Sequence, residues 1–97
     1  MLTKNQIKKA VLKIAPMYDI EKVFLFGSYA RGDATEESDL DLRVVGGGVR
    51  GLFELNGLFM DFEEALEVKI DIVMTDGMTE KFYDLIKEDE VLVYAKI

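Results

Sequence analysis

Three aspartates are the residues of this sequence whose type and spacing most clearly could support chemistry. Asp39 and Asp41 flank Leu40, and Asp71 lies about thirty residues later in an otherwise apolar segment. Side chains of a strand alternate between its two faces, so Asp39 and Asp41 should point the same way while Leu40 and Leu42 point into the core. Neighbouring carboxylates repel each other unless a cation lies between them. Mg²⁺ takes oxygen ligands, usually one or two carboxylates plus substrate phosphates.

A Gly-Ser pair is the second candidate feature. Gly27 and Ser28 directly follow the apolar run 23–26, where we expect a strand to end and a short helix to begin. Glycine lets the backbone approach a ligand closely, and exposed N–H groups at a helix start favour an anion. The Ser28 hydroxyl can add a hydrogen bond. Arg31, about one helical turn later, could reach a phosphate. Its alternative partners are the nearby acids Asp33, Glu36 and Glu37.

Each feature also has a purely structural interpretation. Alternating charge is common on a half-exposed strand, and Asp71 could be a surface carboxylate paired with Lys69 or Arg43. The combination is more specific than its parts, because it joins a strand, Gly-Ser, an Asp-x-Asp that opens a second strand, and a third aspartate within another strand. Together these features favour a phosphate-handling site.

Helices and strands alternate along the chain, and their order can position these residues. Thr3 and Gln6 predict a capping box for a helix over about 4–15, which should end near Pro16. An apolar helical stripe over about 51–66 makes that helix long enough to be a crossover. Its members are Leu52, Leu55, Phe59, Phe62, Ala65 and Leu66. The remaining predicted elements are strands at 23–26 (central), 39–45 and 68–74, a helix over 79–87 with Phe82, Leu85 and Ile86 as its core face, and an edge strand at 91–94.

Composition excludes several classes of protein. The 97 residues are expected to form one domain, 1–97. The chain has no cysteine and no histidine, which excludes disulfides, thiolate or imidazole metal sites and a histidine base. No apolar run approaches the roughly 20 residues of a membrane span, and the N-terminus lacks a signal-peptide core, so a cytoplasmic location is expected. The net charge of −7 argues against nucleic acid as a direct long-surface ligand.

The segment Gly27-Ser28-Tyr29-Ala30-Arg31-Gly32, followed by Ser38-Asp39-Leu40-Asp41-Leu42, resembles the signature of the DNA polymerase beta-like nucleotidyltransferase superfamily. It is most similar to the minimal nucleotidyltransferase branch, and the resemblance covers nearly the whole chain. It implies an α/β (α+β) fold with a small mixed sheet and helices packed against it. It also implies that Gly27, Ser28, Arg31 and Ser38 serve the nucleotide or its loop, and that Asp39, Asp41 and Asp71 are the catalytic ligands of two Mg²⁺ ions.

Minimal nucleotidyltransferases are often paired with a HEPN-domain protein. The resemblance therefore implies an antitoxin that transfers a nucleoside monophosphate, AMP from ATP, to a tyrosine of a HEPN toxin. The alternative is a non-catalytic antitoxin or regulatory subunit of the same fold. Either a partner chain or a second copy would supply the acceptor. Apolar side chains exposed on 51–66 or 91–97 are the candidate interfaces. A more distant alternative is an Asp-x-Asp transferase acting on sugar nucleotides, although such folds are usually far longer.

Overall fold

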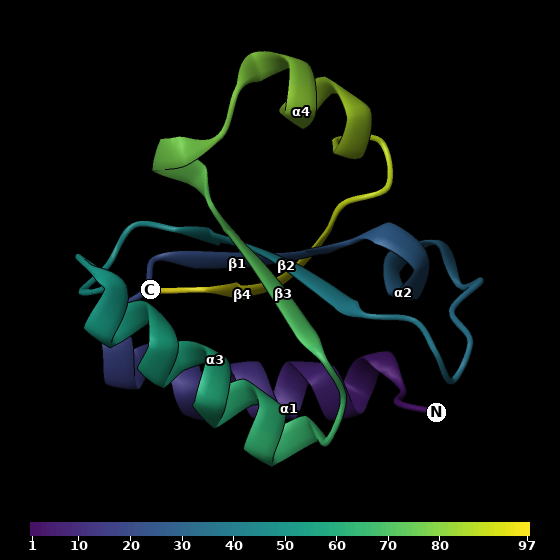
Figure 1. The fold of residues 1–97 in the computed structure, drawn as a ribbon, viewed down its shortest axis with the longest axis horizontal. Helices are drawn as coiled ribbons and strands as arrows, with labels where there is room; N and C mark the ends of the chain where they lie inside the picture. The colour runs from purple at the N-terminus through teal and green to yellow at the C-terminus, as the bar shows by residue number, and fades with distance from the viewer.

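A four-stranded mixed sheet forms the centre of the computed structural model, which describes residues 1–97 (Figure 1). The strands are β1 (Lys22–Phe26), β2 (Leu40–Val45), β3 (Ile70–Met74) and β4 (Val91–Ala95), in the order β3-β2-β1-β4. β1 is antiparallel to both of its neighbours, whereas β2 and β3 are parallel. Parallel neighbours need a crossover, which α3 (Leu52–Leu66) provides. The predicted mixed sheet, central first strand and edge strand are therefore confirmed.

Two helices cover one face of this sheet, below the strands in Figure 1. They are α1 (Lys4–Ile14) and α3. The predicted capping box starts α1: the Gln6 backbone N–H donates to Thr3 Oγ1 at 3.2 Å, and the Thr3 N–H donates to Gln6 Oε1 at 2.8 Å. Proline cannot donate the next helical hydrogen bond, and α1 gives way to the 3₁₀ segment η1 (Ala15–Tyr18) at Pro16.

The core lies between these two helices and the sheet. Leu40 and Leu42 are fully buried, as their alternation with the aspartates predicted. Each such side chain contributes about 1.5–3 kcal/mol when removed from water. The other fully buried large side chains are Ile7, Val11, Ile20, Val23, Leu25, Val44, Leu58 and Phe62. This apolar layer packs against one face of β2. The face of β2 that carries Asp41 therefore lies on the opposite side of the sheet.

Two predicted helix faces are partly wrong. α3 buries Leu58, Phe62 and Leu66, while Leu52 is 77% exposed. At 100° per residue, Leu52 points about 80° away from the middle of this buried line, so the stripe drawn from the sequence was too wide. In α4 (Glu80–Ile86), Ile86 is buried and Leu85 is 74% exposed. Adjacent residues of a helix face different directions, and the short α4 meets the sheet with one side only.

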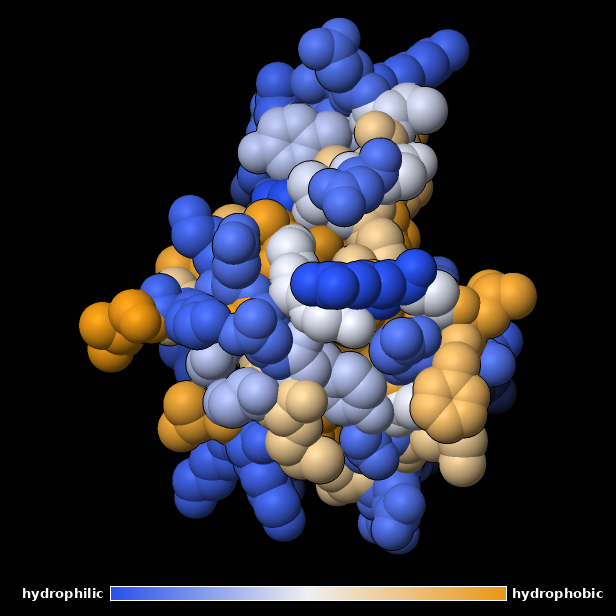
Figure 2. Space-filling model, turned by 90° about the vertical axis from the view of Figure 1, so that its left-hand side faces the viewer, coloured by the Kyte–Doolittle hydropathy of each residue, from blue (hydrophilic) through white to orange (hydrophobic).

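The second face of the sheet carries α4, which projects above the strands in Figures 1 and 2. A bidentate ion pair attaches this region to β2: Arg43 Nε and one terminal nitrogen donate to Glu90 at 2.5 and 2.9 Å. The other terminal nitrogen donates to Thr75 Oγ1 at 3.0 Å. The guanidinium lies 4.2 Å from the Phe24 ring centroid and 5.1 Å from that of Tyr83. Both charged side chains are over 90% buried, so α4 is held against the sheet at this point.

None of the helices has both the length and the apolar character that crossing a membrane requires.

Candidate active site

The strand registers bring two of the predicted aspartates side by side. Asp41 lies opposite Asp71 in the parallel β2–β3 pair and opposite Phe26 in the antiparallel β1–β2 pair. We call this cross-strand set, Asp71–Asp41–Phe26, the carboxylate row. Asp39 precedes β2 by one residue, on the same side as Asp41. Gly27 and Ser28 directly follow Phe26 and begin α2 (Gly27–Arg31). Residues from three separate stretches of the chain thus meet at one end of the sheet.

The backbone at position 27 lies so close to the carboxylate row that only glycine fits there without a shift of Asp41. Its φ of +73° is in the left-handed region, where a side chain is strained. A Cβ at this position would lie 2.2 Å from Asp41 Oδ2 and 3.1 Å from Asp41 Cγ. The sequence predicted a close approach of the Gly27 backbone to a ligand. In the structure, the group that requires glycine is the Asp41 carboxylate.

The electrostatics of the row follow from its crowding. The pKa of Asp41 is raised from 3.8 to about 6, first by partial burial and then by the charges of Asp71 and Asp39. The Arg31 guanidinium acts in the opposite direction and lowers this pKa. The charges of the other two aspartates therefore act on Asp41, and the site has the negative potential that favours a cation.

The surrounding polar contacts agree only in part with those expected from the sequence. Arg31 pairs with Asp33 at 3.3 Å, one of its three predicted alternatives, and also with Asp89 at 3.6 Å. Lys69 approaches Asp39 at 4.0 Å. Asp71 is exposed, as its structural interpretation expected, but the predicted pair with Lys69 or Arg43 does not form, because those cations lie against Asp39 and Glu90.

Ser38 is engaged within its own loop. Its hydroxyl accepts a hydrogen bond from the Thr35 backbone N–H at 2.8 Å. A serine at this position therefore orders the loop that leads into Asp39, which is the supporting role expected from the sequence.

The structure contains no group of three or more aspartates or glutamates arranged so that it could hold a metal ion. The donor chemistry nevertheless fits Mg²⁺, because Asp39, Asp41 and Asp71 offer only carboxylate oxygens and two of them are register neighbours. The assignment of all three as metal ligands stays a prediction.

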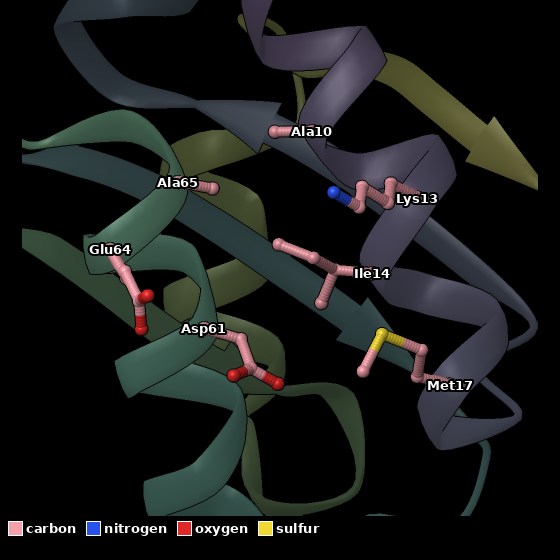
Figure 3. A pocket seen from close by; sticks show the side chains of 7 residues that line it. All are labelled: Ala10, Lys13, Ile14, Met17, Asp61, Glu64 and Ala65. Carbon is pink, nitrogen blue, oxygen red and sulfur yellow. The ribbon is translucent and has the colours of Figure 1, made fainter.

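None of the four hollows in the structure is lined by Asp39, Asp41 or Asp71, and two of them lie on opposite faces of the sheet. One, of about 310 Å³, separates α1 from α3 and is lined by Ala10, Lys13, Ile14, Met17, Asp61, Glu64 and Ala65 (Figure 3). It belongs to the helical layer, on the other side of the sheet from the row. Its Asp61 accepts a hydrogen bond from the Tyr18 hydroxyl at 2.7 Å. The same hydroxyl explains the glycine within α3, since a Cβ on Gly57 would lie 2.8 Å from it.

The other hollow, also about 310 Å³, lies between β3 and α4. It is lined by Val73, Gly77, Met78, Thr79 and Phe82. Sequence analysis missed this pocket. The only signal in the sequence was that Val73 and Asp71 lie on the same face of their strand, and this does not indicate which element covers that face.

The fold and the row define a nucleotidyl-transfer domain of minimal size. Residues 5–96 match the family model described as polymerase beta, nucleotidyltransferase, and the chain belongs to that family. A candidate protein adenylyltransferase of Methanocaldococcus jannaschii is 30% identical over 87 residues, which cover 90% of this chain and 94% of the relative. The protein adenylyltransferase MntA of Thermococcus cleftensis is 29% identical over 86 residues, which cover 80% and 83%. The predicted enzyme class, a nucleotidyltransferase, is confirmed.

Solved structures agree with this assignment. A candidate minimal nucleotidyltransferase superposes with a TM-score of 0.78 at 30% identity, covering 93% of this chain and 95% of the other. A toxin-antitoxin crystal structure with AMP-PNP gives a TM-score of 0.77 at 21% identity, covering 98% and 75%. At that lower identity the likeness concerns the fold. The predicted fold of the minimal branch is confirmed.

Proposed function

We propose that this chain is a Mg²⁺-dependent protein adenylyltransferase. It transfers AMP from ATP to a tyrosine hydroxyl of a HEPN toxin partner and acts as the antitoxin of that pair. The observation that carries the proposal is the carboxylate row, with Asp41 against Gly27 and opposite Asp71. The names of the relatives support adenylyl transfer to protein, and the toxin-antitoxin structures of the same fold support the kind of partner.

The chemistry is an in-line displacement at the α-phosphorus of ATP. The acceptor oxygen forms a bond to phosphorus while the bond to the β-phosphate oxygen breaks and pyrophosphate leaves. Gly27 allows the backbone to approach the phosphates, the Ser28 hydroxyl donates to a phosphate oxygen, and Arg31 supplies positive charge nearby. Asp71 lies furthest along the row from Gly27 and accepts the proton of the acceptor hydroxyl. The chain has no histidine that could take this role.

Asp39, Asp41 and Asp71 would hold the Mg²⁺ ions. When bound, the metal pair neutralises the charge that develops on the attacking and leaving oxygens. Burial first, and then the charges of Asp71 and Asp39, raise the pKa of Asp41 to about 6, and a divalent cation would offset those charges.

A partner surface is available on α3. Phe53 is 89% exposed and Met60 is 66% exposed. Apolar atoms form separate groups on an otherwise polar surface in the view of Figure 2. Exposed aromatic and methionine side chains are common anchors of protein interfaces. These side chains support a docked protein partner or a second copy of the chain.

Calorimetric titration of ATP with Mg²⁺ tests the nucleotide site. We expect wild-type protein to bind ATP only with Mg²⁺ present, and Asp39→Asn/Asp41→Asn to lose this binding. Glu63→Gln/Glu64→Gln removes the same charge from the exposed surface of α3 and should bind normally. Transfer of label from α-labelled ATP to a co-purified HEPN protein then tests the reaction. Binding without transfer would favour the non-catalytic antitoxin, and Mg²⁺-independent binding in the double variant would refute the site.

A further inference from the structure

The pocket between β3 and α4 lies on the same face of the sheet as the carboxylate row, and the strand registers show on which side of the row it lies. Val73 follows Asp71 by two residues on the same strand face, a distance of about 6.6 Å along β3. From above, the Phe82 ring meets Phe26 of the row edge-on, with ring centroids 6.1 Å apart. The pocket between Val73 and Phe82 therefore lies on the same face of the sheet as the two paired aspartates, displaced from Asp71 by two residues along β3.

The Gly27–Ser28 turn lies on the opposite side of the row. β1 runs from Lys22 towards Phe26, so Gly27 continues beyond the row. Val73 instead pairs with Arg43, which pairs with Phe24, two residues before the row in β1. The carboxylate row thus separates the turn proposed to hold the phosphates from the pocket.

The geometry of in-line displacement indicates from which side of the row the attacking hydroxyl should arrive. The attacking and leaving oxygens lie roughly on one line through the phosphorus. If the α-phosphorus lies at the carboxylates and pyrophosphate departs towards Gly27–Ser28, the attacking hydroxyl arrives from the pocket side. We propose that the pocket lined by Val73, Met78 and Phe82 is the acceptor subsite, and that it receives the phenol ring of a tyrosine. This inference rests on the proposed function.

The lining suits that ring. Val73 and Met78 offer apolar surface, and methionine sulfur makes favourable contacts with aromatic rings. Phe82 can contact a second ring edge-on, as it does Phe26. The phenol oxygen would face Asp71, which takes its proton as the oxygen bonds to the α-phosphorus and pyrophosphate leaves.

The far wall of the pocket is braced. Thr75, at the start of η2 (Thr75–Gly77), donates its hydroxyl hydrogen to the Val44 carbonyl at 2.9 Å and accepts from Arg43. Arg43 in turn binds Glu90, at the start of the final strand, and packs beneath Tyr83 of α4. Both ends of the η2–α4 segment are therefore tied to β2, which fixes the position of this segment over the sheet.

Methyl NMR can identify the occupant directly. The protein would carry labelled methionine and valine methyl groups, with Mg²⁺, a non-hydrolysable ATP analogue and N-acetyl-tyrosinamide at tens of millimolar. We expect nuclear Overhauser effects from the phenol ring protons to the methyls of Met78 and Val73. Effects from adenine protons instead would overturn the proposal by making the pocket a nucleobase subsite. The absence of both would also overturn it.

A pocket-filling variant provides the kinetic test. Met78→Trp should raise the acceptor concentration for half-maximal transfer about tenfold or more. The dissociation constant of ATP should stay within about twofold of wild type. Met17→Trp, an equal change at an exposed position of η1 on the other face of the sheet, is the control. Weakened ATP binding with unchanged acceptor dependence would refute the subsite. The Ser28 amide reports the proposed function separately: if it fails to shift with ATP and Mg²⁺, the nucleotide site itself is wrong.

Discussion

Replacing Gly27 by alanine tests the contact between the glycine turn and the carboxylate row. The new Cβ would lie 2.2 Å from Asp41 Oδ2, about 1 Å inside ordinary contact distance. The Asp41 carboxylate must therefore move. Backbone strain at positive φ costs about 1–2 kcal/mol, and overpacking adds about 1–3 kcal/mol. We expect Gly27→Ala to lower the free energy of unfolding by about 2–5 kcal/mol.

Gly32→Ala is the matched control. Gly32 also has positive φ, +87°, but a Cβ there would meet nothing within 4 Å. This variant should lose only the backbone cost of about 1–2 kcal/mol and keep full activity. The difference between the two variants isolates the contact with Asp41.

Urea denaturation in EDTA measures the stability of both variants, and adenylyl transfer to the partner measures their activity. Displacing a reacting group by about 1 Å costs on the order of a hundredfold in rate, so Gly27→Ala should lose about that much activity. If Gly27→Ala and Gly32→Ala were equal in stability and in transfer rate, the proposed role of this contact would be refuted.

Three further variants test the charges of the structure. The pKa of Asp41 is raised from 3.8 to about 6, so wild type loses stability as pH rises through that interval. In urea titrations, Asp41→Asn should therefore stabilise the metal-free protein by about 1 kcal/mol at pH 7.5 and leave its stability unchanged at pH 3.5. This energy is discounted for solvent screening, because the side chain is half-exposed. Arg43→Met should cost about 3–5 kcal/mol, because it leaves the Glu90 carboxylate buried and unpaired, and adding Glu90→Leu should recover most of that loss in thermal unfolding. Tyr18→Phe removes the hydrogen bond to Asp61 and should cost about 1 kcal/mol at pH 8. Its deficit should shrink by pH 11, because the pKa of Tyr18 is raised from 10.0 to about 12 and wild type loses stability across that interval.

Local sequence determined the elements and the type of site. The capping box of α1 needs only Thr3 and Gln6, which lie within one turn. The alternation of Asp39, Leu40, Asp41 and Leu42 assigns each side chain to a face as soon as the segment is a strand, and the structure buries both leucines. The same short segment, together with the Gly-Ser turn, carried the resemblance to nucleotidyltransferases, and the family match confirms it.

Only the tertiary structure decided which residues meet. The pairing of Asp41 with Asp71 depends on the register of two parallel strands joined through α3, and no local preference sets that register. Arg43 and Glu90 are 47 positions apart, yet they form the buried ion pair beneath α4. The pocket over β3 exists only because α4 packs above that strand, held by this ion pair and by the Phe26–Phe82 contact. Short-range chemistry thus determined which residues are the candidate catalytic groups, whereas long-range packing paired Asp41 with Asp71, raised the pKa of Asp41 and shaped the space over β3.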